Sequence, residues 1–240
     1  IEIKKAYLGD ALVYDKTGSF SPINLTNLEV WLDASDGTTI TESLGYVSEW
    51  RDKSGNSKHA SQIIAGRQPT ITTFNGLSAI NFGKSLRQYF DVVCAQIGSA
   101  DNVIYVVLEN ADATITTRQR IWQAEISGST KYGLQNDPID GASYICNSSF
   151  TRIGTAYNQG KHVMIGYRNG AIGAVGYDGS FATSGDVDDT PAFSQCTIGG
   201  YKPGDIDYFN GKIAEIIIQT HYDVTEISNT LDYLNAKWGL

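Results

Sequence analysis

The chain has 240 residues, with 18 Lys and Arg against 26 Asp and Glu, and so carries a formal net charge of −8 at pH 7. This acidic balance, without any Lys/Arg-rich run, excludes a nucleic-acid binder that works through clustered positive charge. The length is enough to bury a large core without cross-links, and the 25 Gly and 14 Tyr residues, with only 18% charged residues, exclude a disordered chain and favour short strands joined by tight turns.

The first 24 residues are predicted to form an arm that precedes the main domain. Residues 1–14 alternate loosely between apolar and polar residues around Gly9 and Asp10, which is the pattern of a short β-hairpin or an extended arm. A turn-rich stretch then leads to residue 25. We therefore expect an N-terminal arm or hairpin over residues 1–24 and one main domain over residues 25–240.

In the main domain, short apolar or alternating runs are separated by clusters of Gly, Asn, Asp or Ser. Strands at this spacing favour an antiparallel sandwich or barrel. The clearest hairpin joins residues 162–167 to residues 171–177 through Asn169 and Gly170. Asn-Gly readily adopts the positive φ angles of a type I′ turn, so the sequence predicts that turn here.

One segment predicts a helix, and it closes the chain. Its apolar residues recur at spacings of four, three and four and share one side: Ile227, Leu231, Leu234 and Trp238. Asp223 followed by Glu226 has the pattern of a capping box, and Gly239 is a typical helix stop. We expect this helix to lie flat on the sandwich or to close one of its ends.

The cysteines and the apolar runs say little about location. Cys94, Cys146 and Cys196 are odd in number and contain no CxxC pair, so they predict neither a disulfide framework nor a zinc site. We interpret them as small buried apolar residues, with one disulfide plus a free thiol as the alternative. The longest apolar run, residues 103–108, is far shorter than the ~18 residues that a membrane helix needs, so we expect no membrane insertion.

Several sequence patterns occur in order along the main domain. They are LEVWLDAS (Leu28–Ser35), VSEWRDKSGN (Val47–Asn56), Gln68-Pro69, NGLSAINF (Asn75–Phe82), YFNGKIAEIII (Tyr208–Ile218) and LNAKWGL (Leu234–Leu240). The series resembles the laminin-G-like, concanavalin A-type jelly-roll modules found in phage virion proteins and bacterial surface proteins. The resemblance implies an antiparallel two-sheet jelly roll, with Trp31, Trp50 and Trp238 in its core. Such modules mostly bind glycans or proteins, and one branch hydrolyses glycosides.

The arm carries a second resemblance. Its sequence AYLGDALVYD is similar to the opening of many phage tail and head proteins, where a strand pair precedes a host-facing module. This resemblance implies that the arm joins the module to a particle or to other copies. The candidate assembly residues are Tyr7, Leu8, Leu12 and Tyr14.

Hydrolysis is not expected. A retaining glycosidase needs two carboxylates roughly 5 Å apart, and the glucanase branch of the resembled fold carries them as E-x-D-x-x-E, a string that this sequence lacks. The nearest apolar strand, IAEIIIQ, holds only Glu215. A lone carboxylate there requires hydrogen-bonding partners, so we expect Glu215 to anchor a backbone segment or an Arg. We predict a protein without enzymatic activity.

The resemblance leaves a calcium site open. Concanavalin A-type modules often bind calcium through loop carboxylates and carbonyls. The loop acids that fit are Asp33, Asp36, Asp52, Asp205 and Asp207. Asp205 and Asp207 are the leading candidates because they lie close together in a Gly-flanked loop, although such acids also form Asx turns without an ion. We therefore expect no required cofactor, with calcium as a candidate ligand.

Glycan binding needs an exposed aromatic ring beside polar groups that satisfy sugar hydroxyls. Trp122 lies outside the resembled motifs, near two arginines, and several later loops combine Tyr with Asn, Asp or Arg. The candidate glycan-binding residues are Trp122, Tyr132, Tyr144, Arg152, Tyr201 and Tyr208. Loop residues Asn147, Tyr157 and Asn158 have the same chemistry.

The leading hypothesis is a non-enzymatic phage surface protein, on tail or head, that adheres to host-surface glycans. Its expected partners are other virion proteins, through the arm, and a host glycan. Display in many copies would make weak sites useful, because linked sites raise the effective concentration. The alternatives are a purely structural decoration protein that binds no sugar and a bacterial secreted lectin-like module.

Overall fold

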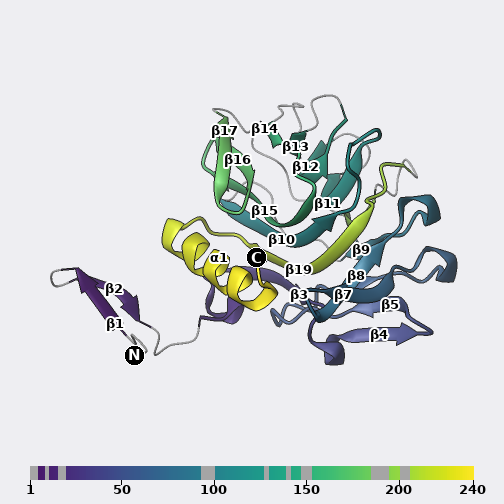
Figure 1. The fold of residues 1–240 in the computed structure, drawn as a ribbon, viewed down its shortest axis with the longest axis horizontal. Coiled ribbons are helices and arrows are strands. Elements are labelled where there is room, and N and C mark those ends of the chain that lie inside the picture. Colours follow the sequence, from purple (N-terminus) through teal and green to yellow (C-terminus); the bar gives the residue numbers. More distant parts are fainter. Residues whose placement is uncertain are drawn as a thin grey trace.

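The computed structural model describes most of the main domain and the backbone of a hairpin near the N-terminus. The described residues are 5–8, 11–15, 20–92, 101–126, 130–138, 142–146, 153–184, 195–200 and 206–240. Within them the architecture is all-β with one long C-terminal helix, and the strands form two packed layers (Figure 1). The predicted fold class, an antiparallel two-sheet sandwich with a C-terminal helix, is confirmed.

One layer, the helix-side layer, is built around two long central strands. In spatial order its strands are β17 (Ser180–Ser184), β16 (Ile172–Tyr177), β15 (Gly160–Asn169), β10 (Asn102–Asn110), β19 (Gly211–Gln219), then β3 (Leu28–Asp33) and β8 (Leu77–Phe82), and finally β7 (Thr70–Phe74). Strand β19 is long enough to pair with β8 along its first part and with β3 along the rest. All of these pairings are antiparallel.

The opposite layer is also antiparallel. Its strands are β14 (Ile153–Ala156), β13 (Ala142–Cys146), β12 (Thr130–Asn136), β11 (Gln119–Ile126), β18 (Gln195–Ile198), β9 (Phe90–Val92), β6 (Ala60–Ser61), β5 (Tyr46–Trp50) and β4 (Ile40–Ser43). The two layers meet at both sides of the sandwich. At one side β14 packs against β16 and β17, and at the other β5 pairs with β7 between Tyr46 and Thr70.

The remaining elements are a hairpin, a helix and four short 3-10 turns. They are β1 (Lys5–Leu8), β2 (Ala11–Asp15), η1 (Pro22–Asn24), η2 (Gly37–Thr39), η3 (Ala65–Arg67), η4 (Lys84–Leu86) and α1 (Val224–Trp238). Strands β1 and β2 pair in antiparallel fashion and form a sheet of their own, so the predicted N-terminal hairpin is confirmed. The side chains of Tyr7, Leu8, Leu12 and Tyr14 lie outside the described set, and their assembly role stays a prediction.

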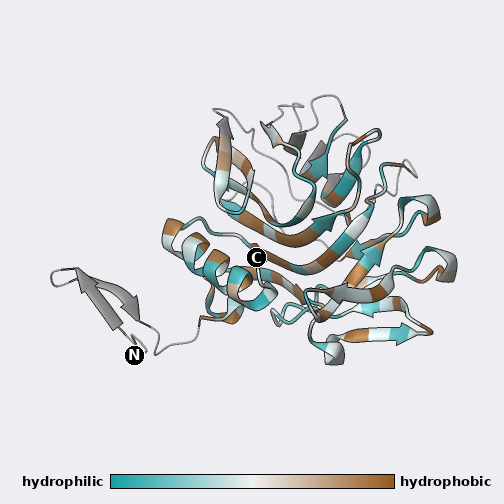
Figure 2. Cartoon of the chain, viewed as in Figure 1, coloured by the Kyte–Doolittle hydropathy of each residue, from teal (hydrophilic) through white to brown (hydrophobic). Residues whose placement is uncertain are grey.

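Strand β10 explains how the helix-side layer is buried on both faces. In residues 103–108, even-numbered side chains face the core between the layers, and odd-numbered ones face α1. All six are apolar, so the strand lacks the polar alternation of a sheet with one wet face. Figure 2 shows the same hydrophobic character along β10 and β19. Trp31, Trp50 and Trp238 are buried, as the resemblance implied.

Helix α1 lies flat on the outer face of the helix-side layer, as predicted. Ile227, Leu234 and Trp238 are buried against that face, and Leu231 packs beside them. The helix begins after Asp223, whose carboxylate accepts from the backbone N–H groups of Thr225 and Glu226, 2.8 and 2.9 Å away. Among the described residues, no helix combines the length and apolar character that crossing a bilayer requires.

The two ends of α1 differ in how well the sequence predicted them. Gly239 adopts a left-handed conformation with φ of 66° and ends the helix as expected. The predicted capping box is wrong in its second half. Instead of reaching back to the helix start, the Glu226 carboxylate accepts from the backbone N–H and hydroxyl of Thr26 and from the Gln219 amide. Glu226 thus joins the helix to the sheet.

A buried carboxylate holds α1 onto the layer below it. Glu215, on β19, is 1% exposed. It accepts hydrogen bonds from the indole N–H groups of Trp31 and Trp238, each at 2.7 Å, from the Tyr233 hydroxyl at 3.1 Å, and from Lys237 Nζ at 2.7 Å. Burial raises the pKa of Glu215 although Lys237 opposes the change. The expected anchoring role is confirmed, with indole, phenol and ammonium partners in place of backbone or arginine.

The hairpin β15–β16 is confirmed, but its turn differs from the predicted type. Asn169 pairs with Ile172, so Gly170 and Ala171 occupy the two central positions. Of these two, only Gly170 has a positive φ, at 59°. A glycine with positive φ at the first central position is the pattern of a type II′ turn, not type I′. The pairing register, one residue different from the expected one, decides which residues form the turn.

The cysteine interpretation is also corrected. Cys196, on β18, is buried and disulfide-bonded, so it is not merely a small apolar residue. The second cysteine of the bond is not among the described side chains, which also exclude those of Cys94 and Cys146. Of the two sequence-based interpretations, the one that includes a disulfide therefore fits Cys196.

Candidate functional site

Two of the aromatic residues predicted to bind glycan lie in the core. Trp122 is 2% exposed and Tyr132 is 1% exposed, and their rings meet edge to face with centroids 6.3 Å apart. The Tyr132 hydroxyl donates to Asn102 Oδ1 at 2.7 Å. A sugar needs an accessible ring face, so this burial argues against the predicted role of both residues.

Of the other predicted glycan-binding residues, the structure describes the side chain of one and not those of the other three. Tyr208 is buried, with its ring centroid 6.3 Å from that of Tyr89, and it offers no open face either. Tyr144 lies on β13, but its side chain is outside the described set, as are Arg152 and Tyr201 altogether. For these three residues the prediction stays a prediction.

The leading calcium pair, Asp205 and Asp207, is not supported by its described member. The Asp207 carboxylate pairs with the guanidinium of Arg120, with Oδ2 3.3 Å from Nη2, and this cation already neutralises it. Asp205 lies outside the described residues. In the part of the chain that the structure describes, no three His, Cys, Asp or Glu side chains gather as a metal site would require.

A different set of residues surrounds an open hollow where the two layers meet beside β14. The hollow has a volume of about 480 Å³ and is here called the Tyr157–Asp178 hollow. It is lined by Thr155, Ala156, Tyr157, Asn158, Tyr177, Asp178 and Ser180. These residues come from β14 and the segment after it, from the end of β16, and from the turn into β17, so the packing of β14 on β16 and β17 creates the site.

The β16–β17 turn fixes the carboxylate of the hollow. Asp178 and Gly179 both have positive φ, at 54° and 82°, which is the geometry of a tight hairpin turn. Asp178 Oδ1 accepts from the backbone N–H of Val163 at 2.8 Å, and Oδ2 lies 2.7 Å from His162 Nδ1. Both contacts come from β15, and the Asp178 side chain remains 44% exposed.

Both tyrosine rings of the hollow are held by their hydroxyl groups. The Tyr157 hydroxyl donates to the backbone carbonyl of Asp112 at 2.5 Å, and that of Tyr177 donates to Asn136 Oδ1 at 3.2 Å. Burial raises the pKa of the Tyr157 hydroxyl, which keeps it in the donating, protonated form. The rings therefore need no reordering when a ligand arrives, which limits the entropy lost on binding.

Asp112, whose backbone carbonyl accepts from the Tyr157 hydroxyl, is itself held by other side chains. Its carboxylate accepts from Lys84 Nζ at 2.7 Å and from the side-chain amides of Asn210 and Gln119 at 2.6 and 2.5 Å. Burial works to raise the pKa of Asp112, but the hydrogen bonds from Lys84 and Asn210 outweigh it and leave that pKa below its usual value. This ionised hub supports one wall of the hollow.

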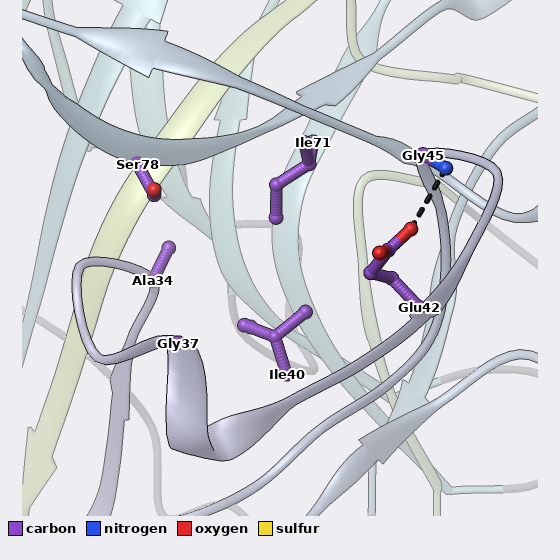
Figure 3. A pocket seen from close by; sticks show the side chains of 7 residues that line it. All are labelled: Ala34, Gly37, Ile40, Glu42, Gly45, Ile71 and Ser78. Atoms are coloured by element: carbon purple, nitrogen blue, oxygen red, sulfur yellow. Dashed lines mark hydrogen bonds between the residues drawn. The ribbon is translucent and has the colours of Figure 1, made fainter.

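A second hollow of about 480 Å³ lies where the inter-layer core opens near β4 and β7 (Figure 3). It is here called the Ile40–Ile71 hollow and is lined by Ala34, Gly37, Ile40, Glu42, Gly45, Ile71 and Ser78. Ile40 and Ile71 point into it, and the Glu42 carboxylate accepts from the backbone N–H of Gly45 at 2.7 Å (Figure 3). Its described lining has no aromatic ring.

The two hollows are equal in volume but differ in chemistry. Only the Tyr157–Asp178 hollow combines aromatic rings with amide, hydroxyl and carboxylate groups, which is the combination that sugar recognition requires. Tyr157 and Asn158 were predicted from the sequence as loop residues of suitable chemistry, whereas Tyr177, Asp178 and Ser180 were not. The Asp178-Gly179 pair between alternating runs was a usable hairpin signal.

No model of a protein family and no curated protein sequence matches the chain. Solved structures do resemble it. Domain 4 of AbnA, an extracellular arabinanase from Geobacillus stearothermophilus solved with arabinotriose, superposes with a TM-score of 0.63 at 14% identity, over 85% of this chain and 98% of that domain. The fold is a concanavalin A-like β-sandwich.

Two further structures share this fold. The binding domain of Paraclostridial Mosquitocidal Protein 1 superposes with a TM-score of 0.63 at 12% identity, over 90% of this chain and 54% of that one. Trypanosoma rangeli sialidase, solved with the inhibitor DANA, gives a TM-score of 0.60 at 15% identity over 85% of this chain. This chain spans only 32% of that sialidase chain. At such identities the likeness shows the fold alone.

Proposed function

We propose that this chain is a carbohydrate-binding module that acts by binding and not by catalysis, and that the sugar occupies the Tyr157–Asp178 hollow. The observation that carries the proposal is the partly exposed Tyr157 ring, held through its hydroxyl, in an open hollow that also presents hydroxyl, amide and carboxylate groups. The volume of about 480 Å³ falls within the range of ordinary small-ligand sites.

The lining offers both groups that bind a sugar, an aromatic ring and polar side chains around it. The C–H face of a sugar ring is apolar and packs on an aromatic ring, for which Tyr157 is the more accessible candidate. The hydroxyls of the sugar need donors and acceptors at its rim, which Thr155, Asn158 and Ser180 supply in addition to Asp178. The arabinotriose bound to domain 4 of AbnA supports a sugar as the ligand class of this fold.

The absence of catalysis is part of the same proposal. Hydrolysis of a glycoside generally needs two carboxylates about 5 to 9.5 Å apart. Among the described residues that line the hollow, Asp178 is the one acid, and it is already engaged by β15. Outside the hollow, the neighbouring carboxylates Asp33 and Glu215 are bridged by Lys237 of α1.

Binding to a glycan array by the intact chain and its variants tests the proposal. Tyr157→Ala should weaken binding at least about tenfold, because removing a stacked ring of ~1.4 kcal/mol or more changes affinity by that factor. Asn158→Ala, which removes an exposed amide, should weaken binding without lowering the thermal midpoint. The matched control is Tyr46→Ala, a tyrosine 46% exposed that follows Gly45, a residue lining the other hollow.

The outcomes separate the two hollows. Loss of binding in Tyr157→Ala and Asn158→Ala, with Tyr46→Ala unchanged, supports the proposed site. Unchanged binding in both hollow variants would overturn it, and selective loss in Tyr46→Ala would move the site to the Ile40–Ile71 hollow. An array on which the wild-type chain binds nothing would remove the carbohydrate-binding function itself.

We also propose, from the sequence resemblance alone, that the module is displayed outside the cell on a phage particle through the β1–β2 hairpin. The comparisons with solved structures add no support to this role. Deletion of residues 1–15 should abolish incorporation into particles while sugar binding remains, and unchanged incorporation would contradict the role of the hairpin. A structural decoration protein would lose incorporation in the same way but bind no sugar.

A further inference from the structure

The acceptor positions of Asp178 that the protein itself occupies can be counted. A carboxylate offers about four acceptor positions, two on each oxygen. Val163 N–H occupies one position on Oδ1, and the His162 ring lies at one position on Oδ2. Both contacts come from β15, and the side chain is 44% exposed. About one acceptor position on each oxygen therefore remains for a ligand.

Two vacant positions on neighbouring oxygens match a particular chemical group. Two hydroxyls on adjacent carbons of a sugar ring can each donate to one oxygen of the same carboxylate. Such hydrogen bonds to an ionised acceptor are roughly twice as strong as neutral ones. Because the turn and the two β15 contacts hold the Asp178 carboxylate in place, it is preorganised for this diol.

The charge of the hollow is a second criterion for the kind of sugar that binds. The described residues that line the hollow include Asp178 but no Lys or Arg. An anionic sugar such as a uronic acid would bring its carboxylate close to that of Asp178 without a cation in the described lining to compensate. Two such charges repel each other, and the repulsion is several times stronger near a protein surface than in bulk water.

From this geometry we infer that Asp178 determines the specificity of the hollow, binding two adjacent hydroxyls of a neutral sugar and disfavouring anionic sugars. This inference rests on the proposed function and goes beyond it by naming the ligand class and the residue that selects it. The similarity in fold to a sialidase does not transfer sialic acid to this site.

The test uses matched ligands and matched variants. The ligands are galactose and galacturonic acid, and glucose and glucuronic acid, each displayed on a polymer so that multivalency brings weak binding into range. The variant Asp178→Asn removes the charge, keeps an oxygen that can accept from Val163 N–H, and tolerates the positive φ of this turn. Glu42→Gln, at the Ile40–Ile71 hollow, is the control.

Wild-type protein should bind the hexose at least about tenfold more tightly than the uronic acid in whichever pair binds. Asp178→Asn should weaken hexose binding about tenfold or more and bring the ratio close to one, while Glu42→Gln changes neither value. Uronic acids that bind as well as hexoses, or an unchanged ratio in Asp178→Asn, would overturn the role of Asp178 and leave the proposed function intact. If no sugar binds the wild-type chain, the proposed function fails as well.

Discussion

Glu215 and Asp178 are both carboxylates held by side chains or backbone from other strands, yet their surroundings differ in two measurable ways. Glu215 is 1% exposed and accepts from four donors, which fill its acceptor positions. Asp178 is 44% exposed on its side chain and has two contacts from β15. The first carboxylate holds α1 on the sandwich, and the second has capacity left for a ligand.

This difference shows which features separate a structural carboxylate from a binding one. In the sequence, each residue is the single acid of a short stretch, Glu215 within the apolar run IAEIIIQ and Asp178 at the turn in AVGYDGS. Burial and the number of filled acceptor positions distinguish them, and both follow from tertiary packing. The two hollows also show that tertiary structure decides the chemistry of a site. Their volumes are equal, but the residues that line them differ.

The largest expected effect is on stability, at Glu215. Glu215→Ala should lower the free energy of unfolding by about 3–5 kcal/mol, because it leaves two buried indole N–H groups without their acceptor and takes from Lys237 one of its two carboxylate partners, with Asp33 as the other. Urea unfolding measures this change. The control, Glu42→Ala on exposed β4, should stay within about 0.5 kcal/mol of wild type. A loss below about 1 kcal/mol at Glu215 would show that the network is not what holds the helix.

A smaller effect concerns proton binding by Asp33, which pairs with Glu215 across β3 and β19. Burial works to raise the pKa of Asp33, but hydrogen bonds and charge from Lys237 outweigh it, so this pKa lies below the ordinary value of 3.8. The corresponding stabilisation is complete above that value and is lost as pH falls through the folded-state pKa. Unfolding free energies measured between about pH 5 and about pH 3 should therefore fall less in Asp33→Asn than in wild type. Parallel curves would contradict this.

The fold could be predicted because its signals are local. Alternation identified strands, the apolar spacing identified α1, and Asp223 and Gly239 marked its two ends. The capping contact predicted for Glu226 shows the limit of such signals. Its carboxylate accepts instead from Thr26, which is 200 residues away in sequence. Local patterns predict elements, and distant partners decide what individual side chains bond to.

The site could not be predicted to the same degree, and Trp122 shows why. A register shift between Arg120 and Trp122 leaves Ile121 unpaired in β11, and both Ile121 and Trp122 pack in the inter-layer core. Simple alternation would place these neighbours on opposite faces. Conversely, the hollow gathers residues from β14, β16 and β17, whose proximity depends on how the two layers meet.

The smallest expected effect is the stability change in Asp178→Asn. The asparagine keeps an oxygen acceptor for the Val163 N–H, and its side chain tolerates the φ of 54°. The carboxylate is partly exposed, so its loss should change the free energy of unfolding by no more than about 0.5 kcal/mol. Urea unfolding of Asp178→Asn and Glu215→Ala under the same conditions compares the free energies of unfolding that the two carboxylates contribute. A loss of several kcal/mol in Asp178→Asn would contradict the distinction between the two carboxylates, because Asp178 would then be a structural anchor like Glu215. Weaker sugar binding in that variant would then no longer identify a contact between Asp178 and the ligand.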